Sequence, residues 1–188
     1  ILDLTTSEIS KIRGAKIAFI FQEPMSALNP VVKVGRQVAE ILEIHAPSMS
    51  GEEIKRRVMG LFVEVGISAP EQRVEQFPHQ LSGGMRQRVM IAMALAAEPD
   101  ILIADEPTTA LDVTIQSQIL KLIKEIQKKR GMAMILITHD FGIVQGFTDR
   151  TFVMYGGRII EAADTKKIIS SPCHPYSQGL IASMPSFS

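Results

Sequence analysis

The sequence predicts an α/β protein whose parallel sheet is interrupted by an all-helical insert. Three short hydrophobic runs, at residues 17–21, 101–104 and 132–137, have the length and composition of buried strands. Residues 24–97 show only helical spacing, whereas strands and helices alternate after residue 98. Continuous hydrophobic strands that alternate with amphipathic helices predict a parallel sheet covered on both faces.

The first strand and the insert follow each other directly. Gln22-Glu23-Pro24 ends the first run, because proline cannot continue a central strand. Hydrophobic residues then recur at helical spacing over residues 34–42 and 54–65. A third helix is expected from Ser82-Gly83-Gly84 to about Ala97, where Glu98-Pro99 ends it.

The carboxy-terminal half has recognisable helix and turn signals. Asp112 can cap a helix with a hydrophobic stripe, and Gly131 can end that helix before the run at 132–137. Residues 152–160 contain Gly156-Gly157 between two hydrophobic runs, which is typical of a hairpin.

Composition limits the possible functions. The 188 residues suffice for one domain, and the 20 basic and 20 acidic residues give no reason to expect a nucleic-acid partner. The single cysteine, Cys173, excludes an internal disulfide and a multi-cysteine metal site. The hydrophobic stretch at 89–97 is far shorter than the roughly 20 residues that a membrane-spanning helix needs.

Two acidic residues end the second predicted strand. Asp105 and Glu106 would lie at the carboxyl edge of a parallel sheet, where open α/β folds bind ligands. Phosphoryl transfer needs a carboxylate for Mg²⁺ and a group that orients or deprotonates the attacking water. Asp105 suits the metal role and Glu106 the base role. The alternative is a polar strand end that runs into a turn at Pro107.

His139 and Gln22 follow neighbouring strands and are therefore expected at the same edge. The imidazole of His139 could contact a γ-phosphate, and the amide of Gln22 could contact a metal and water. An exposed loop histidine and a simple turn residue are the alternatives.

Residues 81–88, Leu-Ser-Gly-Gly-Met-Arg-Gln-Arg, predict an anion site at a helix start. Two glycines allow backbone N–H groups to approach an anion closely, and the helix dipole favours negative charge there. Consecutive glycines cost helix propensity, so a structural or functional reason is expected for them.

This segment resembles the signature motif of ABC transporter ATPases. Asp105-Glu106 resembles their Walker B strand end, Ala110-Leu111-Asp112 their D-loop, His139 their switch histidine and Gln22 their Q-loop glutamine. The residues before the signature, Phe77-Pro78-His79-Gln80, the stretch 105–116 and His174-Pro175-Tyr176 look like the ATP-binding subunits of dipeptide and oligopeptide importers. Nickel importers share that pattern.

The resemblance implies the P-loop NTPase-like fold of an ABC ATPase. Residues 1–23 and 98–161 would form its sheet core, 24–97 its helical subdomain with the signature, and 162–188 a carboxy-terminal helical tail. It further implies ATP and Mg²⁺ as cofactors, Asp105 and Gln22 as metal contacts, and Glu106 and His139 as catalytic residues. The implied nucleotide-binding residues are Gln22, Ser82, Gly83, Gly84, Gln87 and Asp112.

The implied activity is ATP hydrolysis that energises peptide import. A second ABC ATPase domain would pair head to tail with this one, and two membrane permeases would contact residues 22–30. The expected location is cytoplasmic, at the inner face of the membrane.

One family motif is missing from these residues. A phosphate loop has the form G-x-x-x-x-G-K-[ST], and none of the 13 glycines is followed by lysine. We therefore expect an amino-terminally truncated domain that does not hydrolyse ATP alone. The alternatives are a regulatory fragment that donates only its signature, and a soluble ABC ATPase outside transport, which the neutral charge and importer-like tail disfavour.

Overall fold

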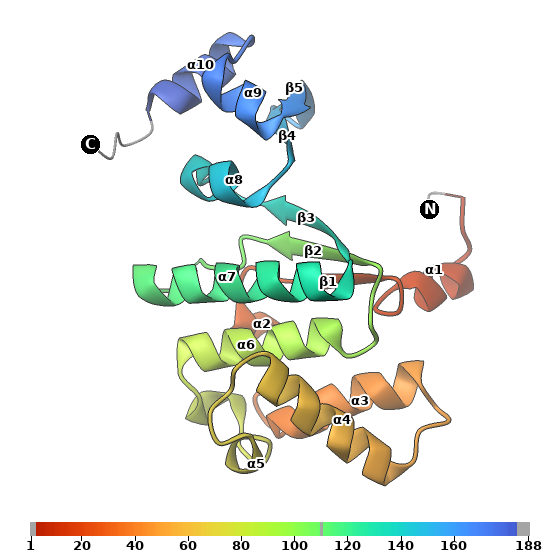
Figure 1. The fold of residues 1–188 in the computed structure, drawn as a ribbon. Coiled ribbons are helices and arrows are strands. Elements are labelled where there is room, and N and C mark those ends of the chain that lie inside the picture. Colours follow the sequence, from red (N-terminus) through yellow and green to blue (C-terminus); the bar gives the residue numbers. More distant parts are fainter. Residues whose placement is uncertain (1–2, 110, 184–188) are drawn as a thin grey trace. The chain divides into compact units, whose positions relative to one another are not determined.

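The computed structural model describes residues 3–109 and 111–183. The chain forms two compact units, residues 1–137 and 138–188, which are described separately. The first unit contains α1 (Thr6–Ile12), the sheet and the helices up to α7; the described part of the second contains a hairpin and three helices (Figure 1).

A parallel sheet is the centre of the first unit. Its strands β1 (Ile17–Ile20), β2 (Ile101–Asp105) and β3 (Ala133–Ile137) lie in the order β1-β2-β3. The register sets Ala18 opposite Leu102 and Asp105 opposite Ile137. The predicted parallel sheet is confirmed, and its strands end at one common edge.

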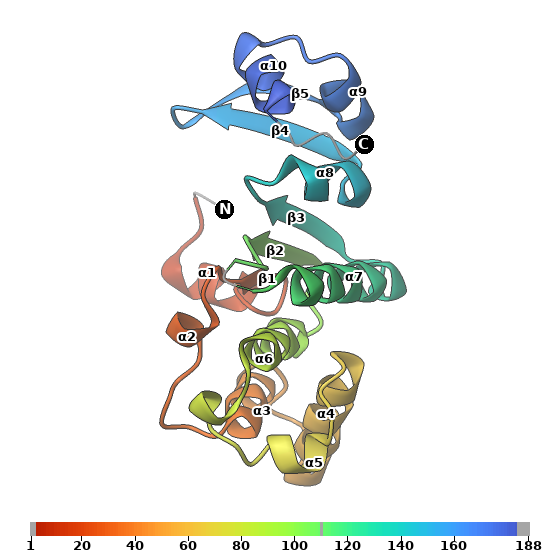
Figure 2. The ribbon, with the colours of Figure 1, turned by 90° about the vertical axis from the view of Figure 1, so that its left-hand side faces the viewer.

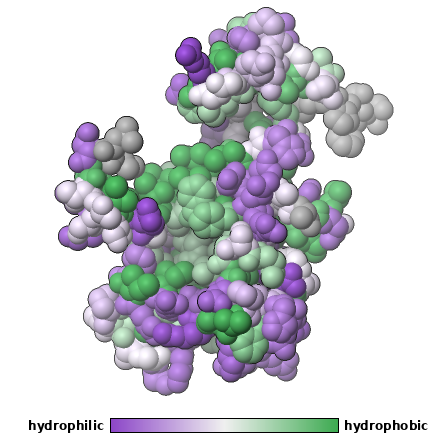
Figure 3. All heavy atoms as spheres, turned by 180° about the vertical axis from the view of Figure 1, so that it is seen from behind, coloured by the Kyte–Doolittle hydropathy of each residue, from purple (hydrophilic) through white to green (hydrophobic). Residues whose placement is uncertain are grey.

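Within the described residues of the first unit, helices cover only one face of this sheet. Ala18, Leu102 and Ala104 point to that face and are buried with residues of α6 (Gly83–Leu95) and α7 (Val113–Arg130), which lie beneath the strands in Figure 2. On the other face, Phe19 and Ile135 are 40% and 53% exposed, and Figure 3 shows hydrophobic surface there. A sheet covered on both faces therefore stays a prediction, because a hydrophobic run identifies a strand without showing what packs on each side.

The helical insert was predicted correctly. From Pro24 to Leu95 the ordered elements are all helical: α2 (Pro24–Ala27), α3 (Val34–His45), α4 (Gly51–Glu64), α5 (Pro70–Arg73), the 3₁₀ turn η1 (Pro78–Gln80) and α6. Helix α4 begins with a capping box, in which Ser50 Oγ accepts from Glu53 N and Glu53 Oε2 from Ser50 N. Helix α6 is buried on most sides, since it lies between the sheet and the rest of the insert (Figure 2).

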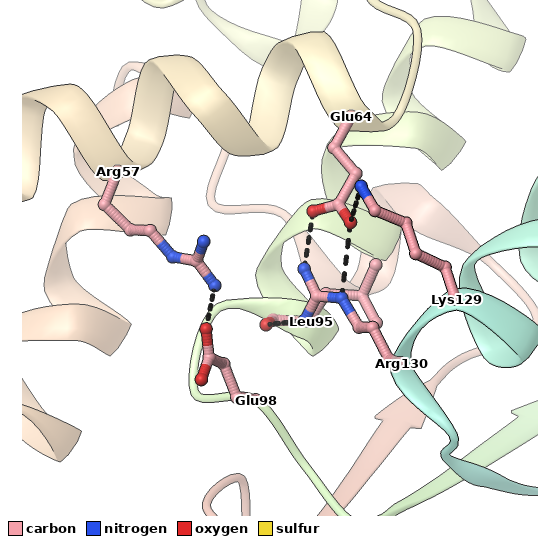
Figure 4. A network of polar contacts seen from close by, with 6 residues as sticks. All are labelled: Arg57, Glu64, Leu95, Glu98, Lys129 and Arg130. Atoms are coloured by element: carbon pink, nitrogen blue, oxygen red, sulfur yellow. Dashed lines mark hydrogen bonds and ion pairs between the residues drawn. The ribbon is translucent and has the colours of Figure 1, made fainter.

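A polar network joins the insert to the sheet layer (Figure 4). Arg130, the last residue of α7, donates to both carboxylate oxygens of Glu64 in α4, at 2.5 and 3.3 Å, and to Leu95 O at the end of α6, at 3.0 Å. Arg57 of α4 pairs with Glu98 in the segment before β2. These contacts tie three helix ends together on the side away from the carboxyl edge of the sheet.

The second unit is built on an antiparallel hairpin. Strands β4 (Arg150–Tyr155) and β5 (Arg158–Asp164) pair around Gly156-Gly157, which confirms the predicted hairpin. Its helices are α8 (Phe141–Phe147), α9 (Thr165–Ser170) and α10 (Pro175–Ala182). The compact units divide after Ile137, whereas the sequence placed the end of the core at residue 161, so the predicted domain boundaries remain a prediction.

No helix in residues 3–109 or 111–183 combines the length and hydrophobicity needed to cross a membrane.

Candidate functional site

The strand β2 leads directly into a tight turn of residues 106–109, which we call the acidic turn. Thr109 N donates to Glu106 O at 3.1 Å, which closes a four-residue turn with Pro107 in its second position, where proline is favoured. Glu106 has a φ of +42°, a left-handed conformation that costs a non-glycine residue about 1–3 kcal/mol. Its own N–H donates to Ile137 O at 2.9 Å, so the end of β3 helps to hold it.

The turn aims the carboxylate of Glu106 at the end of β1. Glu106 Oε2 accepts from Gln22 Nε2 at 2.9 Å and from Thr109 Oγ1 at 2.9 Å. Gln22 lies 84 positions earlier in the chain. The structure therefore brings together two residues that the sequence predicted for one sheet edge.

Asp105 is the last residue of β2, next to this pair, and is half-buried. Mg²⁺ is usually bound through one or two carboxylates together with phosphate oxygens and water, rather than by a complete protein cage. The carboxylate of Asp105 and the amide of Gln22 fit such a partial set. Among the described residues there is no group of three or more His, Cys, Asp or Glu side chains that would form a cage.

The signature segment lies at the start of α6. Ser82 is the N-cap, and its Oγ accepts from Met85 N at 3.3 Å. Ser82 and Gly83 are exposed. A Cβ on Gly84 would lie 2.9 Å from Ile115 Cγ2 of α7, whereas one on Gly83 would meet only Leu111 Cδ2 at 3.5 Å. Close packing on α7 thus explains Gly84, while nothing in this packing requires Gly83 to be glycine.

Gln87 is buried in this structure rather than open to a ligand. The residue is 1% exposed and its Nε2 donates to Pro107 O at 2.6 Å, so its contact with nucleotide stays a prediction. Helical spacing did not reveal this, because α6 is hydrophobic on most sides and the buried face is not obvious from the sequence. Gln87 therefore supports the acidic turn from α6.

Two other predicted site residues, Asp112 and His139, are exposed. Asp112 is exposed and caps α7, where its Oδ1 accepts from Ile115 N at 2.9 Å, as the sequence predicted. Ala110 of the predicted D-loop lies outside the described residues. His139 is exposed and follows β3, but it belongs to the second compact unit, so its place beside Glu106 stays a prediction.

A family model described as "ABC transporter" matches residues 2–109. The chain belongs to the ABC transporter family. A second model, described as the carboxy-terminal region of oligopeptide/dipeptide transporters, matches residues 160–188.

Named relatives of this ABC transporter chain include the oligopeptide transport ATP-binding protein OppD of Bacillus subtilis, which is 55% identical over 98% of this chain and 51% of its own length. The dipeptide transport ATP-binding protein DppD of Bacillus subtilis is 54% identical over 97% of this chain and 54% of its own length. The chain therefore spans about half the length of these relatives.

Solved ABC cassettes share the fold. The dimeric post-hydrolysis structure of the ATP-binding cassette MJ0796, bound to ADP and Pi, is 34% identical with a TM-score of 0.76, over 87% of this chain and 68% of that one. CbiO1 from Clostridium perfringens, part of the ABC transporter complex CbiONQ, is 34% identical with a TM-score of 0.77, over 90% and 64%. The predicted ABC ATPase fold is confirmed.

Two residues that support the acidic turn of this ABC transporter chain were not predicted from the sequence. Thr109 holds the carboxylate of Glu106, and Gln116 Nε2 of α7 donates to Thr108 O at 3.2 Å. A signal for Thr109 was present, since a Glu-Pro-x-Thr sequence places a hydroxyl at the closing position of a turn. The role of Gln116 depends on how α7 packs, and no spacing rule indicates it.

Proposed function

We propose that this chain is part of the ATP-binding and ATP-hydrolysing subunit of an ABC transporter that imports peptides. The observation that carries the proposal is the carboxylate of Glu106, held between Gln22 and Thr109 beside Asp105 at the carboxyl edge of the sheet. The named relatives, which are oligopeptide and dipeptide transport ATP-binding proteins, support the peptide cargo.

The acidic turn is suited to act on water. Glu106 orients the attacking water and accepts its proton, because the two hydrogen bonds fix one carboxylate oxygen and thereby the direction of the other. Asp105 and Gln22 would hold Mg²⁺, which when bound neutralises charge on the phosphates. His139 would contact the γ-phosphate.

The signature would serve a different nucleotide. We propose that Ser82, Gly83 and Gly84 contact ATP held by a second ABC ATPase domain, paired head to tail with this one. Support comes from the exposure of Ser82 and Gly83 at the start of a 13-residue helix, where backbone N–H groups and the helix dipole favour an anion. Two permeases would contact residues 22–30, and the subunit would lie at the cytoplasmic face of the membrane.

We further propose that the 188 residues alone do not hydrolyse ATP. None of their 13 glycines is followed by lysine, so a phosphate loop has to be supplied from outside them.

The decisive experiment replaces Glu106 by glutamine in a full-length subunit that contains these residues. We expect ATP to bind with unchanged affinity while turnover falls by at least about 100-fold, because the amide cannot accept the proton. Glu98→Gln is the matched control: Glu98 also has a positive φ, +54°, but lies outside the site, and it should keep turnover within about twofold. Multiple turnover by Glu106→Gln at the wild-type rate would exclude Glu106 as the base.

A further inference from the structure

Gln87 is a buried amide that the proposed reaction does not use directly. The residue is 1% exposed, and its amide donates a hydrogen bond from α6 to the backbone of the acidic turn, at Pro107 O, 2.6 Å away. A buried amide is destabilising unless it is hydrogen-bonded. The bond is therefore a fixed connection between α6 and this turn rather than a chance surface contact.

The turn needs such support, because the left-handed conformation of Glu106 persists only where its surroundings enforce it. Two glutamines from two helices hold successive carbonyls of the turn: Gln87 of α6 holds Pro107 O and Gln116 of α7 holds Thr108 O. Pro107 directly follows Glu106 and its ring locks its φ, so a displacement of the Pro107 carbonyl is carried back to the Glu106–Pro107 peptide and to the Cα that bears the Glu106 side chain.

The same helix carries the signature at its start. Ser82 caps α6, and Gly84 packs so closely on Ile115 that a Cβ would lie 2.9 Å from that side chain. A regular helix transmits a displacement of its first turn to its second turn, where Gln87 lies.

We propose that Gln87 is a positioning residue that couples the signature to the orientation of Glu106. Contact between Ser82 and the ATP of the second domain moves or fixes α6, and Gln87 passes this constraint to Pro107 and so to the carboxylate of Glu106. This inference rests on the proposed function, because it requires the signature and Glu106 to belong to two nucleotide sites of one dimer.

The test uses Gln87→Met in the full-length subunit, since methionine has a similar volume and cannot donate to Pro107 O. We expect kcat for ATP hydrolysis to fall by about 10-fold or more, because small displacements of a catalytic group are costly, with KM within about threefold of wild type. Gln116→Met is the matched control, as it removes a similar bond to the same turn from α7 instead of α6.

A double-mutant cycle separates coupling from simple stiffening of the turn. The double variant Ser82→Ala/Gln87→Met should lower kcat by less than the product of the two single losses. The double variant Ser82→Ala/Gln116→Met should lower kcat by that product. A wild-type kcat in Gln87→Met, or a multiplicative result for that pair, would overturn the proposal.

Thermal melting tests whether the fall in kcat comes from a loss of stability. If Gln87→Met and Gln87→Leu both fail to fold, or both melt far below Gln116→Met, Gln87 is a structural residue and the proposal fails. If Glu106→Gln turns over at the wild-type rate, the proposed function fails and this inference with it. If Glu106→Gln is inactive while Gln87→Met is fully active, only this inference fails.

Discussion

Replacing Arg130 by methionine would test how the helical insert is attached to the sheet layer. Arg130 donates to both oxygens of Glu64 and to Leu95 O, and the side chains of Arg130 and Glu64 are each 16% exposed (Figure 4). Methionine keeps the hydrophobic stem but removes the charge and all three bonds. Glu64 would then keep Lys129, whose Nζ lies 3.6 Å from its Oε1.

The expected loss in the free energy of unfolding is about 2–3 kcal/mol. Breaking an exposed ion pair costs about 0–1 kcal/mol, whereas removing one partner of a fully buried pair costs about 3–5 kcal/mol. A pair that is mostly buried, and that also satisfies a helix-end carbonyl, should fall between these limits. Lys129→Met is the matched control, because the side chain of Lys129 is 75% exposed and its loss should cost less than about 1 kcal/mol.

The same variant should change the dependence of stability on pH. Burial alone would raise the pKa of Glu64, but the hydrogen bond and charge of Arg130, together with Lys129 and Arg57, outweigh burial and hold this pKa below its usual value. A carboxylate with a lowered pKa in the folded state contributes stability above its unfolded pKa of about 4.3, and this contribution is lost as the pH falls through the folded value. The difference in free energy of unfolding between wild type and Arg130→Met should therefore be largest near neutral pH and shrink below about pH 4.

Urea unfolding followed by far-UV circular dichroism, repeated from neutral to acid pH, measures both quantities. The proposed role of Arg130 is refuted if Arg130→Met lowers the free energy of unfolding no more than Lys129→Met does at neutral pH. It is also refuted if the difference between Arg130→Met and wild type stays constant as Glu64 is protonated.

Two further predictions concern the site. Gly84→Ala should destabilise the fold by about 1–3 kcal/mol, because its Cβ would lie 2.9 Å from Ile115. Gly83→Ala should have a free energy of unfolding within about 1 kcal/mol of wild type. Thermal melting checks both variants, and equal melting temperatures would contradict the prediction. In the full-length subunit, Thr109→Val should lower ATP turnover by about 10-fold, because it removes the hydroxyl that fixes Glu106. Thr109→Ser keeps a hydroxyl and should restore most of the turnover. A fully active Thr109→Val would disprove the role of the hydroxyl.

Local patterns predicted much of the fold. The hydrophobic runs became β1, β2 and β3, and the helical spacing between them became the insert. Asp112 and Gly131 delimit α7 as predicted, because capping and the left-handed end of a helix depend on neighbouring residues alone. The meeting of Gln22 with Glu106 across 84 positions also followed from the sequence, since parallel strands end at one edge.

Contacts that depend on helix packing were not predictable in this way. The sequence indicated that Gln87 belongs to a functional segment, but it could not show that its amide points inward to Pro107 O. Likewise, the glycine pair predicted a close approach of backbone and ligand, while the structure shows that Gly84 is also needed for the packing of α6 on Ile115.

The sequence by itself determined the class of this protein, the order of its elements and the identity of the acidic turn, because periodicity, caps and turns are set by residues a few positions apart. The tertiary structure alone decided which face of the sheet is covered and which side chains hold the signature helix to the acidic turn. Those features depend on the rotation and distance of whole elements, which follow from the fit of many side chains at once.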